Sequence, residues 1–410
     1  MAGTAPAART RGGVPETLRR AVRELDPPLA VLDLDAVDEN LDALATRAGG
    51  MPIRVASKSL RCLELVRRAL AHPGFAGVLA FTLPEAIMLA RGGVDDVVVA
   101  YPTAHRAALR ELAADAGLLA RVALMVDSPA HLDLIDRAIE GVELAGELRL
   151  ALDLDASYRP LEQAIGGRVH IGTRRSGIRT PAQARAAAQA IRRREGVRLV
   201  GVMAYEAQIA GVADGASGVS GLATRAMQAA SARELAARRR ALVDAVRESG
   251  PIEFVNGGGT GSLERTAAEG VSTELAAGSG ILSPGLFDGY RGFRHRPAAY
   301  FVCAVARTPA PGIATLLGGG WIASGPPGAD RVPTIAWPEG ARFTAMEGAG
   351  EVQSPITGPG VAVLGAGDQV WLRHAKAGEL AERVNAFEVV ADGARIASWP
   401  TYRGEGHAFL

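Results

Sequence analysis

A lone lysine at the end of an apolar run is the first feature of this chain that suggests chemistry. In the segment RVASKSLR, residues 54–61, Lys58 stands between two serines where a buried strand is expected to end. Lysine is seldom fully buried without a partner, so one reading is a side chain that reaches out to water. The other is a Schiff-base lysine, whose partly desolvated amine loses its proton and attacks an aldehyde. The small flanking serines leave room for a cofactor.

Two glycine-rich turns suggest an anion. The segment FVNGGGTGS, residues 254–262, follows an expected strand and opens an expected helix. Its glycines let backbone N–H groups approach a phosphate, the helix N-terminus adds favourable partial charge, and Thr260 and Ser262 offer hydroxyl groups. The segment ELAAGSG, residues 274–280, follows the next strand and offers a second such turn. A tight turn that binds nothing is the alternative.

The elements that position these residues alternate between apolar runs and Ala-, Leu- and Arg-rich stretches. Nine apolar runs predict buried parallel strands, over residues 29–35, 53–57, 77–82, 96–101, 121–127, 148–155, 198–205, 252–258 and 273–278. Repeated strand–helix units indicate a parallel sheet, and eight strands close a (β/α)8 barrel. We therefore expect one terminal run to lie outside the barrel. Lys58 lies at the carboxyl end of its strand, on the face where barrel enzymes carry their active sites.

The pattern changes after about residue 285. Short apolar runs follow, separated by Gly and Pro and without intervening helices, which predicts a mostly β domain. We therefore predict an N-terminal segment over residues 1–25, a barrel over 26–285 and a β-rich C-terminal domain over 286–410.

Two segments late in the barrel differ in composition and periodicity from the other strand–helix units. Residues 207–222 are rich in glycine and lack periodicity, so we expect a loop over one barrel end. Residues 224–249 predict a long helix, and a solvated face is the simplest explanation of its arginines.

A lysine on an early strand with phosphate-type turns after the last strands resembles the fold-type III enzymes that use pyridoxal 5'-phosphate (PLP). The chain resembles an alanine racemase-like barrel followed by a β domain, over about residues 26–410. It is most similar to the D-threonine aldolase and D-serine dehydratase branch, which includes the amino acid deaminase/aldolase family. The segment PPLAVLDLDAVDENL, residues 27–41, resembles the opening strand and helix, and RVASKSLRC resembles the strand that carries the PLP lysine. The resemblance therefore implies that Lys58 binds PLP.

Further motifs extend the resemblance to the cofactor site. RRSGI, residues 174–178, resembles the segment whose arginine reaches the phenolic oxygen of PLP, which implies Arg175; a surface arginine is the alternative. GVMAYE, residues 201–206, resembles the tyrosine-bearing strand near the cofactor, which implies Tyr205; a core aromatic is the alternative. Glu206 and Gln208 either face the substrate or support the site. The two glycine-rich turns resemble the phosphate-binding turns, which implies Asn256, Gly257, Gly258, Gly259, Thr260, Gly278 and Ser279.

One segment departs from the resembled pattern. The lyases of this branch carry a His-x-Cys or His-x-Asp pair that holds a divalent metal, and here RHAKAGELAERVN, residues 373–385, has His374 followed by Lys376. A protonated ammonium cannot coordinate a metal, so a metal at His374 stays open. Our hypothesis is that Lys376 places its own charge where the metal would lie and stabilises the substrate hydroxyl or carboxylate; a surface lysine is the alternative. His407 is expected to be a structural histidine rather than an active-site one.

The function that the resemblance implies is a PLP-dependent lyase acting on small β-hydroxy D-amino acids through a Lys58 Schiff base. PLP acts as the electron sink. In a D-serine-type deamination Lys58 would take the Cα proton, whereas in a D-threonine-type retro-aldol cleavage a base, for which His374 is the candidate, would take the hydroxyl proton. The alternatives are an amino-acid racemase of the same fold, a non-catalytic PLP-binding protein, and a barrel enzyme in which Lys58 bonds a phosphorylated substrate. The resemblance also implies a homodimer.

Composition excludes several kinds of partner. The 410 residues include 45 basic and 44 acidic side chains, for a net charge of +1, which gives no electrostatic case for nucleic acid or a membrane. No run of about 18 apolar residues predicts a membrane span, and the first residues lack the apolar core of a secretory signal. Cys62 and Cys303 stand in no metal-type spacing, so we expect reduced packing cysteines in a cytoplasmic protein.

Overall fold

The computed structural model describes residues 13–160, 162 and 166–410, and it divides into two compact units. The barrel unit comprises Leu44–Lys58, Arg67–Gly278 and Phe409–Leu410. The β unit comprises the chain up to Ala43, Ser59–Val66 and Ser279–Ala408.

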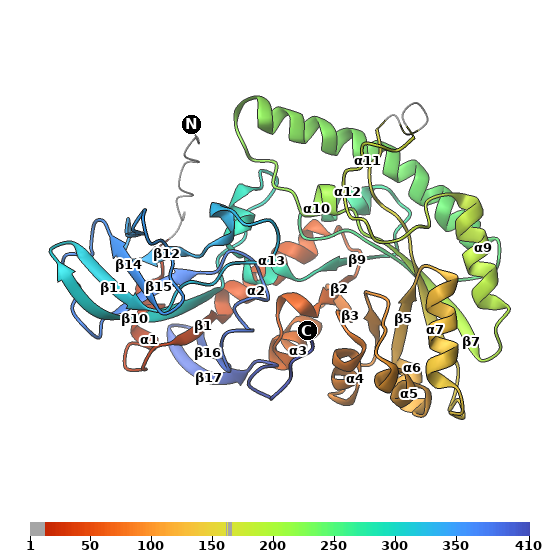
Figure 1. Ribbon diagram of the computed structural model, residues 1–410, viewed down its shortest axis with the longest axis horizontal. Coiled ribbons are helices and arrows are strands. Elements are labelled where there is room, and N and C mark those ends of the chain that lie inside the picture. The colour runs from red at the N-terminus through yellow and green to blue at the C-terminus, as the bar shows by residue number, and fades with distance from the viewer. Residues whose placement is uncertain (1–12, 161, 163–165) are drawn as a thin grey trace. The chain divides into compact units, whose positions relative to one another are not determined.

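The barrel unit contains a closed barrel of eight parallel strands over the described residues, in the order β2-β3-β4-β5-β6-β7-β8-β9 (Figure 1). The strands are β2 (Ile53–Ala56), β3 (Phe75–Ala80), β4 (Val97–Val99), β5 (Val122–Val126), β6 (Leu148–Asp153), β7 (Val197–Ala204), β8 (Phe254–Gly257) and β9 (Glu274–Ala277). The last strand closes on the first, with Ile53 opposite Leu275. Strands of this kind are buried on both faces, which explains their nearly continuous apolar runs. The predicted (β/α)8 barrel is confirmed.

Helices follow the strands, and some of them begin at a residue whose side chain caps them. The helices of the described chain are α1 (Glu16–Ala21), α2 (Leu34–Arg47), α3 (Leu63–Leu70), α4 (Leu83–Arg91), α5 (Arg106–Ala113), α6 (Ala116–Arg121), α7 (Pro129–Ile139), α9 (Pro181–Arg192), α10 (Ala207–Ala210), α11 (Gly218–Arg247), α12 (Leu263–Ala268) and α13 (Ser279–Leu282), with short 3-10 turns η1 (Ser57–Ser59), η2 (Gly285–Gly289) and η3 (Ala329–Arg331). Thr82 caps α4 by accepting a hydrogen bond from the backbone N–H of Glu85. Thr180 and Gln183 form a capping box at the start of α9.

The β unit is built on a nine-stranded sheet of described residues. Its strands are β1 (Leu29–Asp33), β10 (Ala299–Ala310), β11 (Ile313–Leu317), β12 (Thr334–Trp337), β13 (Arg342–Phe343), β14 (Gln353–Thr357), β15 (Gln369–Arg373), β16 (Ala386–Ala391) and β17 (Ala394–Pro400). The N-terminal strand β1 pairs antiparallel with β10 and parallel with β16. It is therefore the ninth apolar run, which was expected to lie outside the barrel, and the predicted β-rich C-terminal domain is confirmed.

The predicted loop over residues 207–222 was wrong in extent. The short helix α10 occupies its start, and α11 begins at Gly218, so seven residues, 211–217, lie between the two helices. Tertiary contacts explain the difference, because the buried Gln208 side chain donates to the carbonyl oxygen of Ala156 at 2.7 Å and to Ser231 Oγ at 3.0 Å.

The predicted solvated face of the long helix was also wrong for one arginine. Arg239 of α11 is fully buried and pairs with Glu206 and Glu269. A face that carries several arginines looks solvated in sequence, but a buried arginine is stable where carboxylates meet it.

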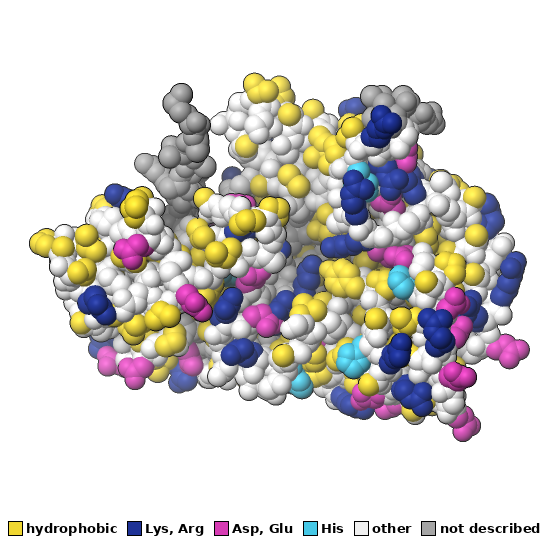
Figure 2. Space-filling view, viewed as in Figure 1, with side chains coloured by type: hydrophobic (Ala, Val, Ile, Leu, Met, Phe, Trp, Pro, Cys, Tyr) yellow, Lys and Arg dark blue, Asp and Glu magenta, His cyan; other side chains and the backbone are white. Residues whose placement is uncertain are grey.

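The distribution of charged side chains and the state of the two cysteines can be read from the structure. Figure 2 shows basic and acidic side chains interspersed over the visible face rather than gathered by sign. Cys62 and Cys303 are buried and form no disulfide. No helix in the described part of the chain is long and apolar enough to cross a bilayer.

Candidate active site

Lys58 lies just past the carboxyl end of β2, in the 3-10 turn η1. The hydroxyl of Ser57 ties this turn to the neighbouring strand by donating to the carbonyl oxygen of Leu79 at 3.2 Å. The side chain of Lys58 is exposed, and its Nζ donates to the Oη of Tyr101 at 3.1 Å. The amine is thus accessible and has a defined direction, as a lysine that attacks an aldehyde requires.

Tyr101 and Arg175 surround this amine. Tyr101 follows β4, so it lies at the same end of the barrel as Lys58. The guanidinium of Arg175 lies 5.2 Å from the centre of the Tyr101 ring and 6.0 Å from that of Tyr205. Burial alone would raise the pKa of Tyr101, but the charges of Lys58 and Arg175 and the hydrogen bond from Lys58 outweigh it and lower that pKa. The structure therefore brings together Lys58, Arg175 and Tyr205, three of the residues named from the sequence.

Tyr205, like Tyr101, is half-buried. Burial, with smaller contributions from Glu206 and Tyr101, raises the pKa of Tyr205 to about 12, against the opposing charge of Arg175. Its phenol stays protonated at neutral pH. Tyr205 can therefore donate a hydrogen bond but has no tendency to act as a base.

Two carboxyl groups complete this end of the barrel. Asp127 follows β5 and pairs with His131 at 3.1 Å, while Asp153 is the last residue of β6 and is buried. Burial is the main cause that raises the pKa of Asp153 to about 7; Asp127 adds to the rise and Arg175 opposes it. Asp153 therefore exchanges its proton near neutral pH, close to the charge of Arg175. Carboxyl groups tuned in this way are concentrated at functional sites.

The glycine-rich turn after β8 is fixed by its own packing. Gly258 has φ +79°, a conformation that favours glycine. A Cβ at Gly259 would lie 2.9 Å from the Cβ of Ala210 and 3.1 Å from the ring of Tyr205. Both glycines are therefore required by the turn itself, and they bring its backbone directly beside Tyr205. Gly257 ends β8, and Thr260 is buried with its carbonyl oxygen bonded to Arg47.

A buried carboxylate, Glu206, anchors this turn through hydrogen bonds. It accepts hydrogen bonds from the N–H of Gly258 at 3.3 Å, from Ser262 Oγ at 2.7 Å and from the hydroxyl of Thr266. It also pairs with the guanidinium of Arg239 at 2.6 Å. Glu206 therefore supports the turn rather than facing a ligand, which was one of the two roles open to it in the sequence.

The side chain of Asn256 is held by a buried ionic cluster. Its side-chain amide donates to Glu274 at 2.8 Å, and Glu274 forms a bidentate pair with the buried Arg54. Arg54 also pairs with Asp96 at 2.8 Å. The side chain of Asn256 is thus committed to this ionic cluster of the barrel unit.

The other candidates lie in the β unit or at its boundary. Gly278 follows β9, and Ser279 begins α13, where its Oγ lies 3.0 Å from Ser59 Oγ. His407 is half-buried, and its backbone N–H donates to the carbonyl oxygen of Tyr402 at 2.8 Å.

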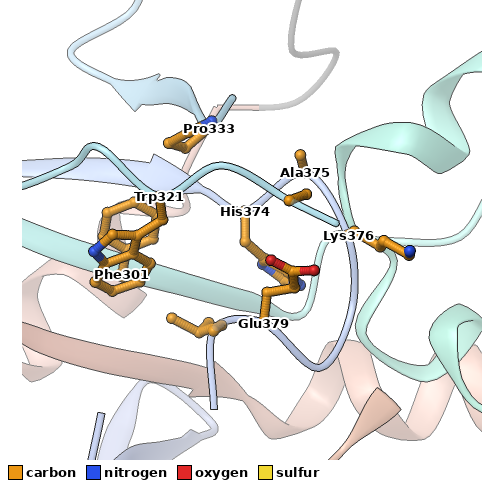
Figure 3. A pocket seen from close by; sticks show the side chains of 9 residues that line it. Phe301, Trp321, Pro333, His374, Ala375, Lys376 and Glu379 are labelled. Carbon is orange, nitrogen blue, oxygen red and sulfur yellow. The ribbon is translucent and has the colours of Figure 1, made fainter. Parts of the chain in front are cut away.

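His374 and Lys376 belong to the β unit, where they line a pocket with Phe301, Trp321 and Glu379 (Figure 3). His374 follows β15 and is buried. Among the described residues no hydrogen bond of standard geometry reaches either ring nitrogen, and a looser hydrogen bond with the backbone of Ala299 works to raise its pKa slightly. Burial, and then the charge of Arg373, lower the pKa of His374 to about 3. The imidazole is therefore neutral at physiological pH.

Lys376 does not direct its ammonium toward His374. Its Nζ donates to Ser324 Oγ at 2.8 Å and to the Ser324 carbonyl oxygen at 3.3 Å, and Figure 3 shows the side chain pointing away from His374 and Glu379. No group of three potential metal-ligating side chains occurs in the part of the chain that the structure describes. The residues present therefore do not fit a divalent metal.

Sequence reasoning missed Tyr101, Asp127 and Asp153. Tyr101 and Asp127 are the last residues of runs that were recognised as strands, and the rule that singled out Lys58 finds both when it is applied to every strand end. Asp153 ends β6 in the structure but lies two residues before the end of its predicted run, 148–155.

Comparison with known proteins places the chain in a family. Residues 32–282 match the alanine racemase N-terminal domain family, so the chain belongs to that family. It is 28% identical over 298 residues to a D-threonine aldolase of an Arthrobacter species, which covers 70% of each chain. It is 26% identical over 259 residues to a 3-hydroxy-D-aspartate aldolase of Paracoccus denitrificans, which covers 62% of this chain and 60% of that one.

Solved structures agree with the fold. A D-threonine aldolase from Filomicrobium marinum superposes with a TM-score of 0.77 at 21% identity, covering 97% of this chain and 99% of that one. A D-threo-3-hydroxyaspartate dehydratase, solved in a metal-free form with a cysteine replaced by alanine, gives a TM-score of 0.67 at 20% identity over 93% of this chain and 98% of that one. At these identities the likeness establishes the fold alone.

Proposed function

We propose that this protein is a PLP-dependent lyase that acts on small β-hydroxy D-amino acids. The observation that carries the proposal is the accessible amine of Lys58 at the carboxyl end of β2, hydrogen-bonded to Tyr101 and close to the ring that Arg175 also faces. The family match supports the proposal, as do two curated relatives that are named aldolases of D-threonine and 3-hydroxy-D-aspartate.

The residues of the barrel unit fit PLP. Lys58 would supply the amine for its aldehyde, and Arg175 would supply a positive charge for its phenolic oxygen. The turn at Gly258–Thr260 would bring its backbone beside a phosphate near Tyr205, with the N–H groups of Gly258 and Gly259 donating to Glu206 and Ser262. When bound, PLP supplies the electron sink that makes a substrate carbanion accessible.

The chain's own side chains handle protons. Lys58 Nζ is the amine at this face that can take or return a proton at the substrate Cα, and Tyr101 fixes its direction by accepting its hydrogen bond at 3.1 Å. Asp153, with a pKa of about 7, holds or releases a proton according to pH and so changes the field at Arg175. Tyr205 stays neutral and offers an O–H donor.

The substrate test separates a lyase from a racemase. Purified protein supplied with PLP is incubated with D-serine, D-threonine and their L enantiomers. We expect the D enantiomers to be consumed, giving either ammonia and a keto acid or glycine and an aldehyde. Appearance of the opposite enantiomer without any of these products would overturn the lyase and favour a racemase.

We further propose that the enzyme works as a homodimer in the cytoplasm. Two buried cysteines that form no disulfide are consistent with a reducing compartment. Light scattering of the active protein tests the dimer, and a fully active monomer would refute it.

A further inference from the structure

The pocket of the β unit around His374 is the place where this chain departs from the lyases that it resembles. The resemblance described above implies a divalent metal held by a histidine and a second ligand two positions later, where this chain has Lys376. The pocket therefore raises a question that the proposed lyase activity does not answer: whether this chain holds a metal.

The side chains that line the pocket offer a poor donor set. His374 contributes one neutral imidazole, and Glu379 is the carboxylate that lines the pocket with it. One oxygen of Glu379 already accepts the backbone N–H of Ser324 at 2.7 Å. Ser324 also anchors Lys376. A closed or open zinc site needs three or four protein ligands, and this pocket has two groups of the right kind.

The charges near the pocket also oppose a divalent ion. Arg373 is buried directly beside His374 and pairs with Asp288 at 2.7 Å, and Lys376 brings a second cation within three residues. Catalytic metal ions are held by anionic or neutral donors that lower the cost of their charge. Here a single carboxylate would have to serve a divalent ion near the charge of Arg373, while the ammonium of Lys376 is turned toward Ser324.

We infer that this protein is a metal-independent member of its branch, in which Lys376 has taken the second ligand position and is tethered to Ser324, while His374 remains at the first. The inference concerns the β-unit pocket of the proposed lyase, but it is tested by metal content and so does not depend on activity. Among the described residues no hydrogen bond of standard geometry reaches either ring nitrogen of His374, so this imidazole can serve as one metal ligand once a second is supplied.

The experiment compares the full-length protein with three variants: Lys376→Cys, Lys376→Ala, and the double variant Lys376→Cys with His374→Ala. The single variant His374→Ala is prepared as well. Each protein is incubated with zinc and PLP, desalted and analysed for metal by mass spectrometry, with circular dichroism to verify folding. Because Lys376 is not buried, its variants are expected to fold. We expect substoichiometric zinc in the natural protein and in Lys376→Ala, about one equivalent in Lys376→Cys, and loss of that zinc in the double variant.

Two outcomes would overturn the inference. Stoichiometric metal in the natural protein that is lost on His374→Ala would show that the pocket binds metal despite Lys376. A folded Lys376→Cys variant without zinc would show that Lys376 is not what excludes the metal. Neither outcome bears on whether D-amino acids are cleaved, so the proposed lyase activity stands or falls separately.

Discussion

Replacing Glu206 by alanine removes the carboxylate on which the glycine-rich turn and helix α11 both depend. Glu206 accepts hydrogen bonds from the turn and from two hydroxyls, and it neutralises the fully buried Arg239 at 2.6 Å. Removing one partner of a buried ion pair costs about 3–5 kcal/mol because the other charge is left uncompensated. Arg239 keeps Glu269 and the carbonyl oxygen of Ala204 as partners, so the lower end, about 3 kcal/mol, applies here.

The chain allows this cost to be assigned to one unit. All four tryptophans, at positions 321, 337, 371 and 399, lie in the β unit, whereas most helices lie in the barrel unit. Far-ultraviolet circular dichroism therefore follows mainly the barrel, and tryptophan fluorescence follows the β unit. At about 2–4 °C per kcal/mol for a domain of this size, we expect Glu206→Ala to lower the dichroism Tm by about 6–12 °C.

The matched control is Glu248→Ala. Glu248 pairs with Arg185 at 2.5 Å, but both side chains are exposed, and exposed ion pairs contribute at most about 1 kcal/mol. If Glu206→Ala lowers the Tm no more than Glu248→Ala does, the carboxylate does not support the barrel in the way described, and the reasoning is refuted.

Three further predictions concern titrating groups. Tyr101→Phe keeps the ring under Arg175 but removes the acceptor of Lys58, so steady-state kinetics on D-serine and D-threonine should show kcat lowered by about 10²-fold, and an unchanged kcat would contradict the orienting role. Burial raises the pKa of Asp153 to about 7, whereas an aspartate in the unfolded chain has a pKa of about 4. Between about pH 4 and pH 7 unfolding therefore releases the proton of Asp153, and the free energy of unfolding falls as pH rises. Asp153→Asn should flatten that part of the stability profile, and an identical profile would be the contrary result. His374, with a pKa of about 3, should show no imidazole titration by NMR near neutral pH; since its unfolded pKa is about 6.5, stability should rise with pH between the two values, and this slope should vanish in His374→Ala.

The architecture was within reach of the sequence because its signals are local. Apolar runs of strand length alternating with helical stretches predict a barrel, and the place of Lys58 follows from where its run ends. The same rule, applied to every strand end, reaches Tyr101, whereas Tyr205 was named through the resemblance of its segment GVMAYE.

The contacts between distant side chains that support the candidate site could not be predicted from the sequence. Glu206 and Arg239 are separated by 33 residues, and nothing in either local pattern shows that they meet. The orientation of Lys376 toward Ser324 depends on a contact 52 residues away. Such pairings are decided by tertiary packing, and a sequence pattern reports only which side chains are available.

The measurement that tests the central claim most directly is identification of the residue that binds PLP. The protein is supplied with PLP, its visible absorption spectrum is recorded, and the sample is treated with borohydride, digested and analysed by peptide mass spectrometry beside Lys58→Ala. The account predicts a borohydride-sensitive visible band and a pyridoxyl group on Lys58, both absent from the variant. No band after addition of PLP, or a label on another lysine, would contradict the assignment of Lys58 and the lyase built on it.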